Sequence, residues 1–314
     1  MQTLAYLTSS SYSGSTLVTF LLNRHPAIAT IGEAEGWHYA PGEDYRCSCG
    51  EALTTCAFFQ RVAANYREAG FSFDPREFGT RLAYVENRRL NTYLVDKLPG
   101  LGSSALERLR DGALRRLPGF AGRFRDSVRR NELMIRTALD YTGASVFVDG
   151  TKNPYRMRFL SALPGFELKP IYLVRDVRGV VASTVRKKGW PVAQAAQKWI
   201  ADQQAILRLL AEQGPYYTLC YEALCADPAA ELAALEAWLG CEAIPWDENY
   251  QAVEHHILGN EMRRQPAGPI RDDRRWQLEL GAAQLDAVAA TVRRFSDDNP
   301  DHVLAPIAAR YLEA

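Results

Sequence analysis

The sequence has no excess of charge of either sign and no long apolar run. Lysine plus arginine and aspartate plus glutamate each total 37 among 314 residues, so net charge predicts no nucleic-acid partner. No apolar stretch approaches the roughly 18 residues that cross a bilayer, which predicts no membrane span. No cationic segment with a following apolar run stands before residues 3–8. We therefore expect a cytoplasmic protein without a signal peptide.

Cysteine is scarce, with six residues in the chain, and the usual C-x₂-C pairs of zinc sites are absent. Three of the six lie close together, namely Cys47, Cys49 and Cys56. Three alternatives stay open for them: zinc binding together with His38, a disulfide, or free thiols that shape a loop. We expect the pair His255-His256 to pack or hydrogen-bond locally rather than to bind a metal.

What the sequence does contain is a set of continuous apolar strands that alternate with segments of helical spacing. Such strands indicate a parallel sheet covered by helices, and we predict a doubly wound α/β fold. Between about residues 57 and 140, strand signals are lacking and arginine, leucine and alanine are abundant. We predict a mainly helical insertion there, between the first and second core strands of a single domain, residues 1–314. The predicted core strands are residues 3–8, 146–148, 171–174 and 216–220.

A loop of small residues follows the first predicted strand and precedes a predicted helix. A strand, a small-residue turn and a helix N-terminus form an anion site, because free N–H groups and the helix dipole face the ligand. The loop is not a Walker A motif, since Ser15 stands where that motif has lysine. Nucleoside triphosphate chemistry is therefore disfavoured. The candidate anion-binding residues are Tyr12, Ser13, Gly14, Ser15 and Thr16.

A second candidate anion site follows the strand 171–174. Arg175 stands at the carboxyl end of that strand, where ligands bind in parallel sheets, and Asp176 is a plausible N-cap of the next helix. Ser183 lies about two turns, or about 10 Å, into this helix. Because Asp176 and Ser183 share a helix face, an extended Arg175 side chain can converge with the Ser183 hydroxyl on one anion.

These two motifs, in this order, resemble the 5′-phosphosulfate and 3′-phosphate motifs of sulfotransferases that use 3′-phosphoadenosine-5′-phosphosulfate (PAPS). The similarity is to the Golgi-type carbohydrate and tyrosylprotein branches and their bacterial relatives. In the family, as here, the arginine and serine of the 3′-phosphate motif are eight positions apart. Further similar segments are Asp149-Gly150-Thr151-Lys152, Tyr221-Glu222-Ala223-Leu224, and Gly259-Asn260 with Arg263, then Asp273 and Trp276.

The resemblance implies a P-loop-NTPase-like sulfotransferase fold, PAPS as donor, and 3′-phosphoadenosine-5′-phosphate (PAP) as product, with no metal required. It places Tyr221 near the adenine and Arg263 in a loop that closes over the cofactor. The relatives usually have arginine or lysine where this chain has Tyr12. Lys152 is therefore the candidate for the cation at the leaving group.

Sulfuryl transfer, like phosphoryl transfer, relies on positioning and charge stabilisation, and it needs a base for the acceptor proton. Glu33 is the candidate base, since the tyrosylprotein branch has a glutamate in this stretch. Glu35 and His38 are the alternatives. The acceptor is a hydroxyl or amine of a small molecule, carbohydrate, lipid or peptide, and the oligomeric state is not readable.

Two rival functions remain at this stage. A P-loop-type kinase or nucleotide hydrolase would use the same type of sheet and would depend on Mg²⁺. A non-catalytic nucleotide-binding protein would bind PAP without turnover, and replacement of Glu33 would then be harmless.

Overall fold

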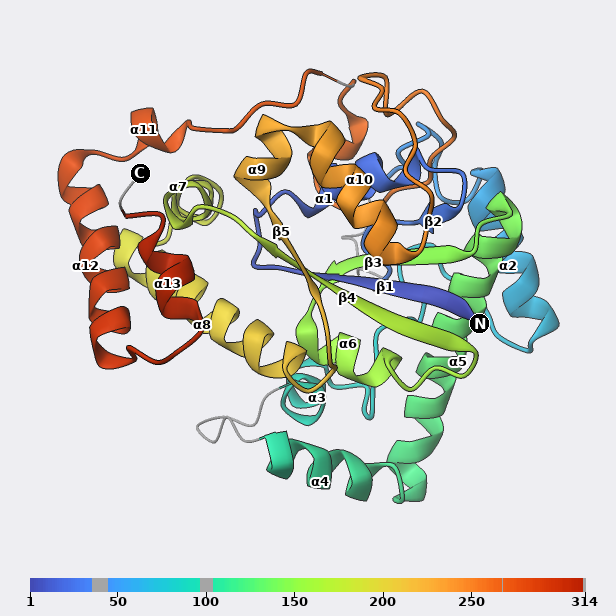
Figure 1. Ribbon diagram of the computed structural model, residues 1–314. Coiled ribbons are helices and arrows are strands. Elements are labelled where there is room, and N and C mark those ends of the chain that lie inside the picture. Colours follow the sequence, from blue (N-terminus) through green and yellow to red (C-terminus); the bar gives the residue numbers. More distant parts are fainter. Residues whose placement is uncertain (36–44, 97–103, 267, 313–314) are drawn as a thin grey trace. The chain divides into compact units, whose positions relative to one another are not determined.

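The strands of the chain form a five-stranded parallel sheet in the order β2-β3-β1-β4-β5 (Figure 1). The structure is a computed structural model that describes residues 1–35, 45–96, 104–266 and 268–312. It confirms the predicted α/β fold with helices flanking a parallel sheet. The strands are β1 (Gln2–Thr8), β2 (Ile28–Thr30), β3 (Val146–Lys152), β4 (Phe166–Val174) and β5 (Tyr217–Cys220).

Strand β2 was not predicted from the sequence, because it has only three residues and therefore shows no period. It pairs in parallel with β3, with Ile28 opposite Val146 and Thr30 opposite Val148. The helical insertion accordingly lies between the second and third strands in chain order, and not directly after the first as expected. The described residues of 57–140 contain helices and no strand.

The helices follow the segments of helical spacing, and capping residues account for several of their ends. Asp176 accepts a hydrogen bond from the Arg178 amide at 2.8 Å, as predicted for an N-cap. Among the described residues, no helix is long and apolar enough to cross a membrane. The helices are α1 (Ser15–Asn23), α2 (Ala57–Glu68), α3 (Arg88–Val95), α4 (Ser104–Leu114), α5 (Pro118–Thr142), α6 (Pro154–Leu160), α7 (Val177–Lys188), α8 (Val192–Leu210), α9 (Tyr221–Ala226), α10 (Pro228–Leu239), the 3₁₀-helix η1 (Glu261–Arg264), α11 (Trp276–Glu279), α12 (Ala282–Asp298) and α13 (Leu304–Ala309).

The chain divides into two compact units, and the first comprises residues 1–6, 16–169 and 249–267. In this unit α2 packs against α5, and α5 covers β2 and β3 (Figure 1). The buried side chains of α2 recur at helical spacing, with Phe58, Phe59, Val62 and Tyr66 all at most 2% exposed. This unit holds β3 and the residues that follow β2.

The second unit comprises residues 7–15, 170–248 and 268–314. In it α7, α8 and α12 pack side by side (Figure 1). Strands β4 and β5 pair in parallel, with Val174 opposite Cys220. Because the next residues are Arg175 and Tyr221, the register brings these two candidate residues to the same edge of the sheet.

Candidate active site

The loop between β1 and α1 has an unusual backbone at two positions. Tyr12 has a φ of 65° and Gly14 a φ of 95°, both in the left-handed region. A Cβ atom on Gly14 would lie 2.7 Å from the Tyr221 ring, so the close approach of the ring requires glycine there. The hydroxyl oxygens of Ser10 and Ser13 are 2.9 Å apart. The loop is thus shaped for close contact with the residue that follows β5.

Arg175 holds this loop from the end of β4. Its Nη1 donates to the Tyr12 carbonyl at 2.9 Å, and its Nη2 donates to the Asp273 carbonyl at 3.0 Å. The same Nη2 lies 3.3 Å from Asp273 Oδ2, and the guanidinium carbon lies 4.4 Å from the centre of the Tyr221 ring. The structure therefore brings three predicted donor-site residues together: Tyr12, Arg175 and Tyr221.

Ser183 shares a helix face with the Arg175 side chain. A Cβ on Gly179 would lie 3.2 Å from Arg175 Nε, so the guanidinium lies over the first turn of α7. Ser183 is one turn further along that face, and its hydroxyl is within 3.4 Å of Arg186 Nη2. Arg186 in turn pairs with Glu279 of α11. The sequence analysis did not single out Arg186, although its spacing of three from Ser183 was a signal.

A lysine that is distant in the sequence lies beside Tyr12, the position at which the sequence resemblance predicts arginine or lysine. Lys188 Nζ lies 5.8 Å from the centre of the Tyr12 ring and 5.0 Å from that of Trp190. Lys188 is the last residue of α7 and far from Tyr12 in sequence, so no local motif revealed it. The loop thus has positive charge nearby despite the tyrosine at position 12.

In the other unit, the candidate base and the candidate cation form an ion pair. Lys152 Nζ donates to Glu33 Oε1, and the two side chains are only 18% and 12% exposed. Lys152 ends β3 with a φ of 76°, a conformation that costs energy for a residue with a Cβ. Backbone strain of this kind is concentrated at functional sites, which supports a functional role for the pair.

The Thr151 hydroxyl positions the chain around Glu33. It accepts hydrogen bonds from the Ala34 and Glu35 amides at 3.0 and 3.2 Å, and it donates to Asp149 Oδ1. Asp149 is fully buried and accepts a hydrogen bond from Arg156 Nε at 3.1 Å. The Asp149–Lys152 segment therefore fixes the residues on either side of the candidate base as well as supplying the cation.

Gly259 brings the start of α1 to Glu33. The Glu33 amide donates to the Leu258 carbonyl at 3.3 Å. A Cβ on Gly259, whose φ is 140°, would lie 3.1 Å from Thr16 Oγ1 and 3.7 Å from Glu33 Oε1. Thr16, the last residue of the predicted phosphate loop, and Glu33 thus both border Gly259.

Arg263 is 4% exposed and binds the carbonyl groups of the turn at Gly259. Its Nη1 donates to the Gly259 carbonyl at 2.7 Å and its Nε to the Arg46 carbonyl at 3.2 Å, while the guanidinium stacks 4.0 Å from the Tyr45 ring centre. These contacts give Arg263 a structural role in the predicted closing loop. A contact with a phosphate stays a prediction.

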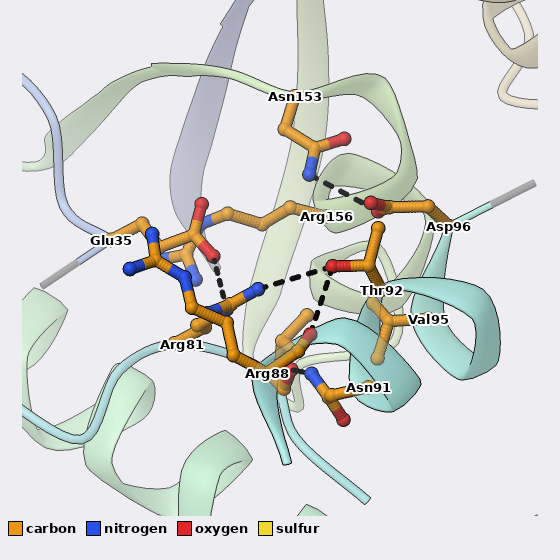
Figure 2. A pocket seen from close by; sticks show the side chains of 10 residues that line it. Glu35, Arg81, Arg88, Asn91, Thr92, Val95, Asp96, Asn153 and Arg156 are labelled. Carbon is orange, nitrogen blue, oxygen red and sulfur yellow. Dashed lines mark hydrogen bonds and ion pairs between the residues drawn. The ribbon is translucent and has the colours of Figure 1, made fainter. Parts of the chain in front are cut away.

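Of the two alternative bases, the structure describes Glu35 but not His38. His38 lies outside the described residues. Glu35 lines a cavity of about 130 Å³, and its carboxylate faces Arg81, with Oε1 3.7 Å from Arg81 Nε (Figure 2). Burial raises the pKa of Glu35 above its usual range, and nearby Arg156 and Arg81 oppose that shift.

The lining of this cavity is mainly charged or amide-bearing. Figure 2 shows the side chains reaching it from α3, from the segment after β3 and from around Arg81. Its residues are Glu35, Arg81, Leu82, Arg88, Asn91, Thr92, Val95, Asp96, Asn153 and Arg156. None of the α3 residues was singled out in the sequence, because a polar helix face is indistinguishable from a solvated one.

The sequence profile of the sulfotransferase family matches residues 7–248, more than two thirds of the chain. The chain belongs to the sulfotransferase family. The match covers both candidate anion sites of this sulfotransferase, as well as Glu33 and Lys152. It ends before the segment that carries Gly259 and Arg263.

Among solved structures, the sulfotransferase domain of the Synechococcus PCC 7002 olefin synthase is similar at 19% identity and a TM-score of 0.50, over 93% of this chain and 94% of that domain. This likeness supports the sulfotransferase fold. The sulfotransferase domain of the curacin biosynthetic pathway matches at 17% identity and a TM-score of 0.46, over 94% and 98%. The sulfotransferase STF1 of Mycobacterium tuberculosis matches at 16% and 0.41, over 77% and 68%. No curated protein sequence matches the chain.

Proposed function

We propose that this sulfotransferase moves a sulfuryl group from PAPS to a hydroxyl or amine of an acceptor, with Glu33 as general base. The observation that carries the proposal is the Glu33–Lys152 ion pair beside Gly259 and Thr16. It unites a carboxylate that can take a proton and a cation that can receive the leaving group. Glu33 borders Gly259, and so does Thr16, the residue that ends the candidate phosphate loop.

The proposal divides donor binding between the two anion motifs. Tyr12, Ser13, Gly14, Ser15 and Thr16 bind the 5′-phosphosulfate through loop amides and hydroxyls at the start of α1. Arg175 and Ser183 bind the 3′-phosphate, and the Tyr221 ring contacts the adenine. The phosphate would replace Asp273 as the anionic partner of Arg175, because a dianion interacts more strongly with the guanidinium than one carboxylate does.

The proposed step is an in-line displacement at sulfur. The acceptor oxygen or nitrogen forms a bond to sulfur, and its proton passes to the Glu33 carboxylate. The bond between sulfur and the bridging phosphate oxygen breaks, and the electron pair leaves on PAP. Lys152 stabilises that charge. When its ammonium group moves from Glu33 to the bridging oxygen, the Glu33 carboxylate becomes free to take the proton. The step itself needs no metal.

For the acceptor, the cavity in Figure 2 favours a polar, hydroxyl-bearing molecule over an apolar one. Glu35 and Asn153, which line it, are close in sequence to Glu33 and Lys152. Arginine, carboxylate and amide groups can hydrogen-bond hydroxyls, and their desolvation would oppose binding of an apolar group.

The test is calorimetric titration of the protein with PAP and, separately, with ATP and Mg²⁺. We expect micromolar PAP binding that is lost in Arg175→Ala and retained in Arg208→Ala, a control on the surface of α8. Transfer of labelled sulfate from PAPS is expected to fall at least about 100-fold in Glu33→Gln with PAP affinity preserved. Equal binding of ATP, independent of Arg175, would replace the proposal with the kinase function. If neither the wild type nor Glu33→Gln transfers sulfate, and both bind PAP equally well, the chain is a non-catalytic binding protein.

A further inference from the structure

Three cysteines and a histidine that the proposed reaction does not use converge in the first unit. The ligand atoms of Cys47, Cys49, Cys56 and His256 all lie within 4.8 Å of one another. Cys47 and Cys56 are fully buried and His256 is 8% exposed. We call these four residues the cysteine–histidine cluster. The zinc alternative for these cysteines included His38, which lies outside the described residues, and His255-His256 was expected to pack or hydrogen-bond locally. The structure places His256 beside Cys47 and Cys56.

Three distances between ligand atoms of the cluster are close to the edges of a zinc tetrahedron. Zn–S bonds of about 2.3 Å and Zn–N bonds of about 2.0 Å give edges of about 3.8 Å between sulfurs and about 3.5 Å between sulfur and nitrogen. Cys49 Sγ and Cys56 Sγ are 3.8 Å apart. His256 Nδ1 lies 3.5 Å from Cys47 Sγ and 3.2 Å from Cys56 Sγ. One ion at the centre would satisfy all four atoms.

The surroundings of His256 favour the tautomer that binds metal. Its Nε2 lies 2.9 Å from Glu254 Oε1, and the Tyr141 hydroxyl donates to the same oxygen at 2.9 Å. A ring that donates its Nε2–H to a carboxylate keeps the Nδ1 lone pair for a ligand bond, as is usual for histidine ligands of zinc. The Phe58 ring stacks on the imidazole at 5.1 Å and fixes its orientation.

We propose that Cys47, Cys49, Cys56 and His256 bind one Zn²⁺ ion as a closed structural site. Thiolates with imidazole are the ligand set that zinc prefers, and four protein ligands leave no position for a substrate. Binding requires the three thiols to lose their protons. A single disulfide explains the geometry less well, because it would pair two of the three thiols and leave the third and the imidazole without a common partner.

The zinc would connect the loop around Cys47 to the segment that contacts the candidate base. The Ser48 hydroxyl accepts from the Ile257 amide at 2.7 Å, and the Gly259 amide donates to the Tyr45 hydroxyl at 3.1 Å. Leu258 and Gly259 then contact Glu33. The ion is thus a positioning element for residues 255–259, outside the reacting atoms, and its existence does not depend on the proposed donor.

The first experiment is metal analysis of the full chain purified without added metal. We expect about one zinc per chain in the wild type and in Cys241→Ser, a control cysteine outside the cluster, and much less in Cys56→Ser and His256→Ala. After chelation under reducing conditions, Co²⁺ is expected to give the visible bands of tetrahedral cobalt and a thiolate charge-transfer band. Cys56→Ser should change both.

Chelation also tests the wild type itself, should the variants fail to fold. We expect zinc removal to lower its melting temperature and zinc addition to restore it. A folded wild type that contains no zinc and gives no thiolate band with Co²⁺ would overturn the proposal. So would non-reducing peptide mapping that shows a disulfide between two of Cys47, Cys49 and Cys56 in the freshly purified protein. PAP titration is independent of these readouts, so the two proposals fail separately.

Discussion

Arg175 is buried and Lys152 half-buried, and both are cations at strand ends, yet they are bound in different ways. Arg175 donates to two backbone carbonyls, pairs with Asp273 and stacks on Tyr221. Lys152 pairs with the carboxylate of Glu33, from a left-handed backbone position. A planar guanidinium has five N–H donors, so it can hold a fixed framework and still donate to a phosphate. An ammonium is a compact charge that can move from one oxygen to another, as a leaving group requires.

The largest effect is expected from Lys152→Ala. Loss of the cation that we propose to stabilise the leaving group should lower kcat about 100- to 1000-fold, while PAP affinity changes little. Steady-state transfer from labelled PAPS, with PAP titration beside it, separates these two effects. Lys198→Ala, which breaks an exposed pair on α8, is the matched control and should leave both unchanged. A fall in PAP affinity as large as the fall in kcat would make Lys152 a binding residue like Arg175.

Arg175→Lys should have the next largest effect, and on binding. A lysine keeps the charge but cannot serve two carbonyls, a carboxylate and a phosphate together. We expect PAP affinity to fall about 10- to 100-fold, which corresponds to about 1.4–2.7 kcal/mol. Calorimetry of Arg175→Lys beside Arg208→Lys checks this. If the lysine binds PAP as well as arginine does, the contrast between the two cations is lost.

Asp273→Asn should strengthen PAP binding a few-fold. Asp273 shares Arg175 with the proposed phosphate, and hydrogen bonding from Arg275 lowers its pKa, so it competes as an anion near neutral pH. The asparagine keeps the backbone carbonyl that Arg175 uses. Asp272→Asn, which instead breaks the pair with Arg274, is the control. Weaker binding in Asp273→Asn alone would mean that Asp273 orients Arg175 instead of competing for it.

The smallest effect concerns Glu35, whose burial raises its pKa in the folded protein. The native state then holds its proton more tightly than the unfolded chain, so stability falls as pH rises from about 4.3, the unfolded value, to the folded pKa. Above that pH the loss stays constant. Glu35→Gln should therefore melt slightly higher than the wild type near neutral pH, with the difference vanishing towards pH 4. A difference that does not depend on pH would show that burial of the charge is not its cause.

The sequence is enough to predict those parts of the candidate site that are encoded locally. The loop after β1, and Arg175 with Ser183, are predictable because a strand end and a helix start place residues of one short segment close together. Lys188 and His256 could not be predicted, since each contacts residues that are far away in the sequence. Strand β2 could not be predicted because three residues show no period. The α3 residues of the cavity could not be predicted because polar residues on a helix usually face water.

Thr151 determines the direction of a relay of hydrogen bonds. Its oxygen already receives two amide protons, so its own proton must point to Asp149, and Asp149 can only accept. Arg156 faces that carboxylate from the other side. Hydrogen bonds thereby connect the buried Arg156–Asp149 ion pair to the backbone amides that follow Glu33. Thr151→Ser would keep the hydroxyl that makes these hydrogen bonds, whereas Thr151→Val, of nearly the same shape, would remove all of them.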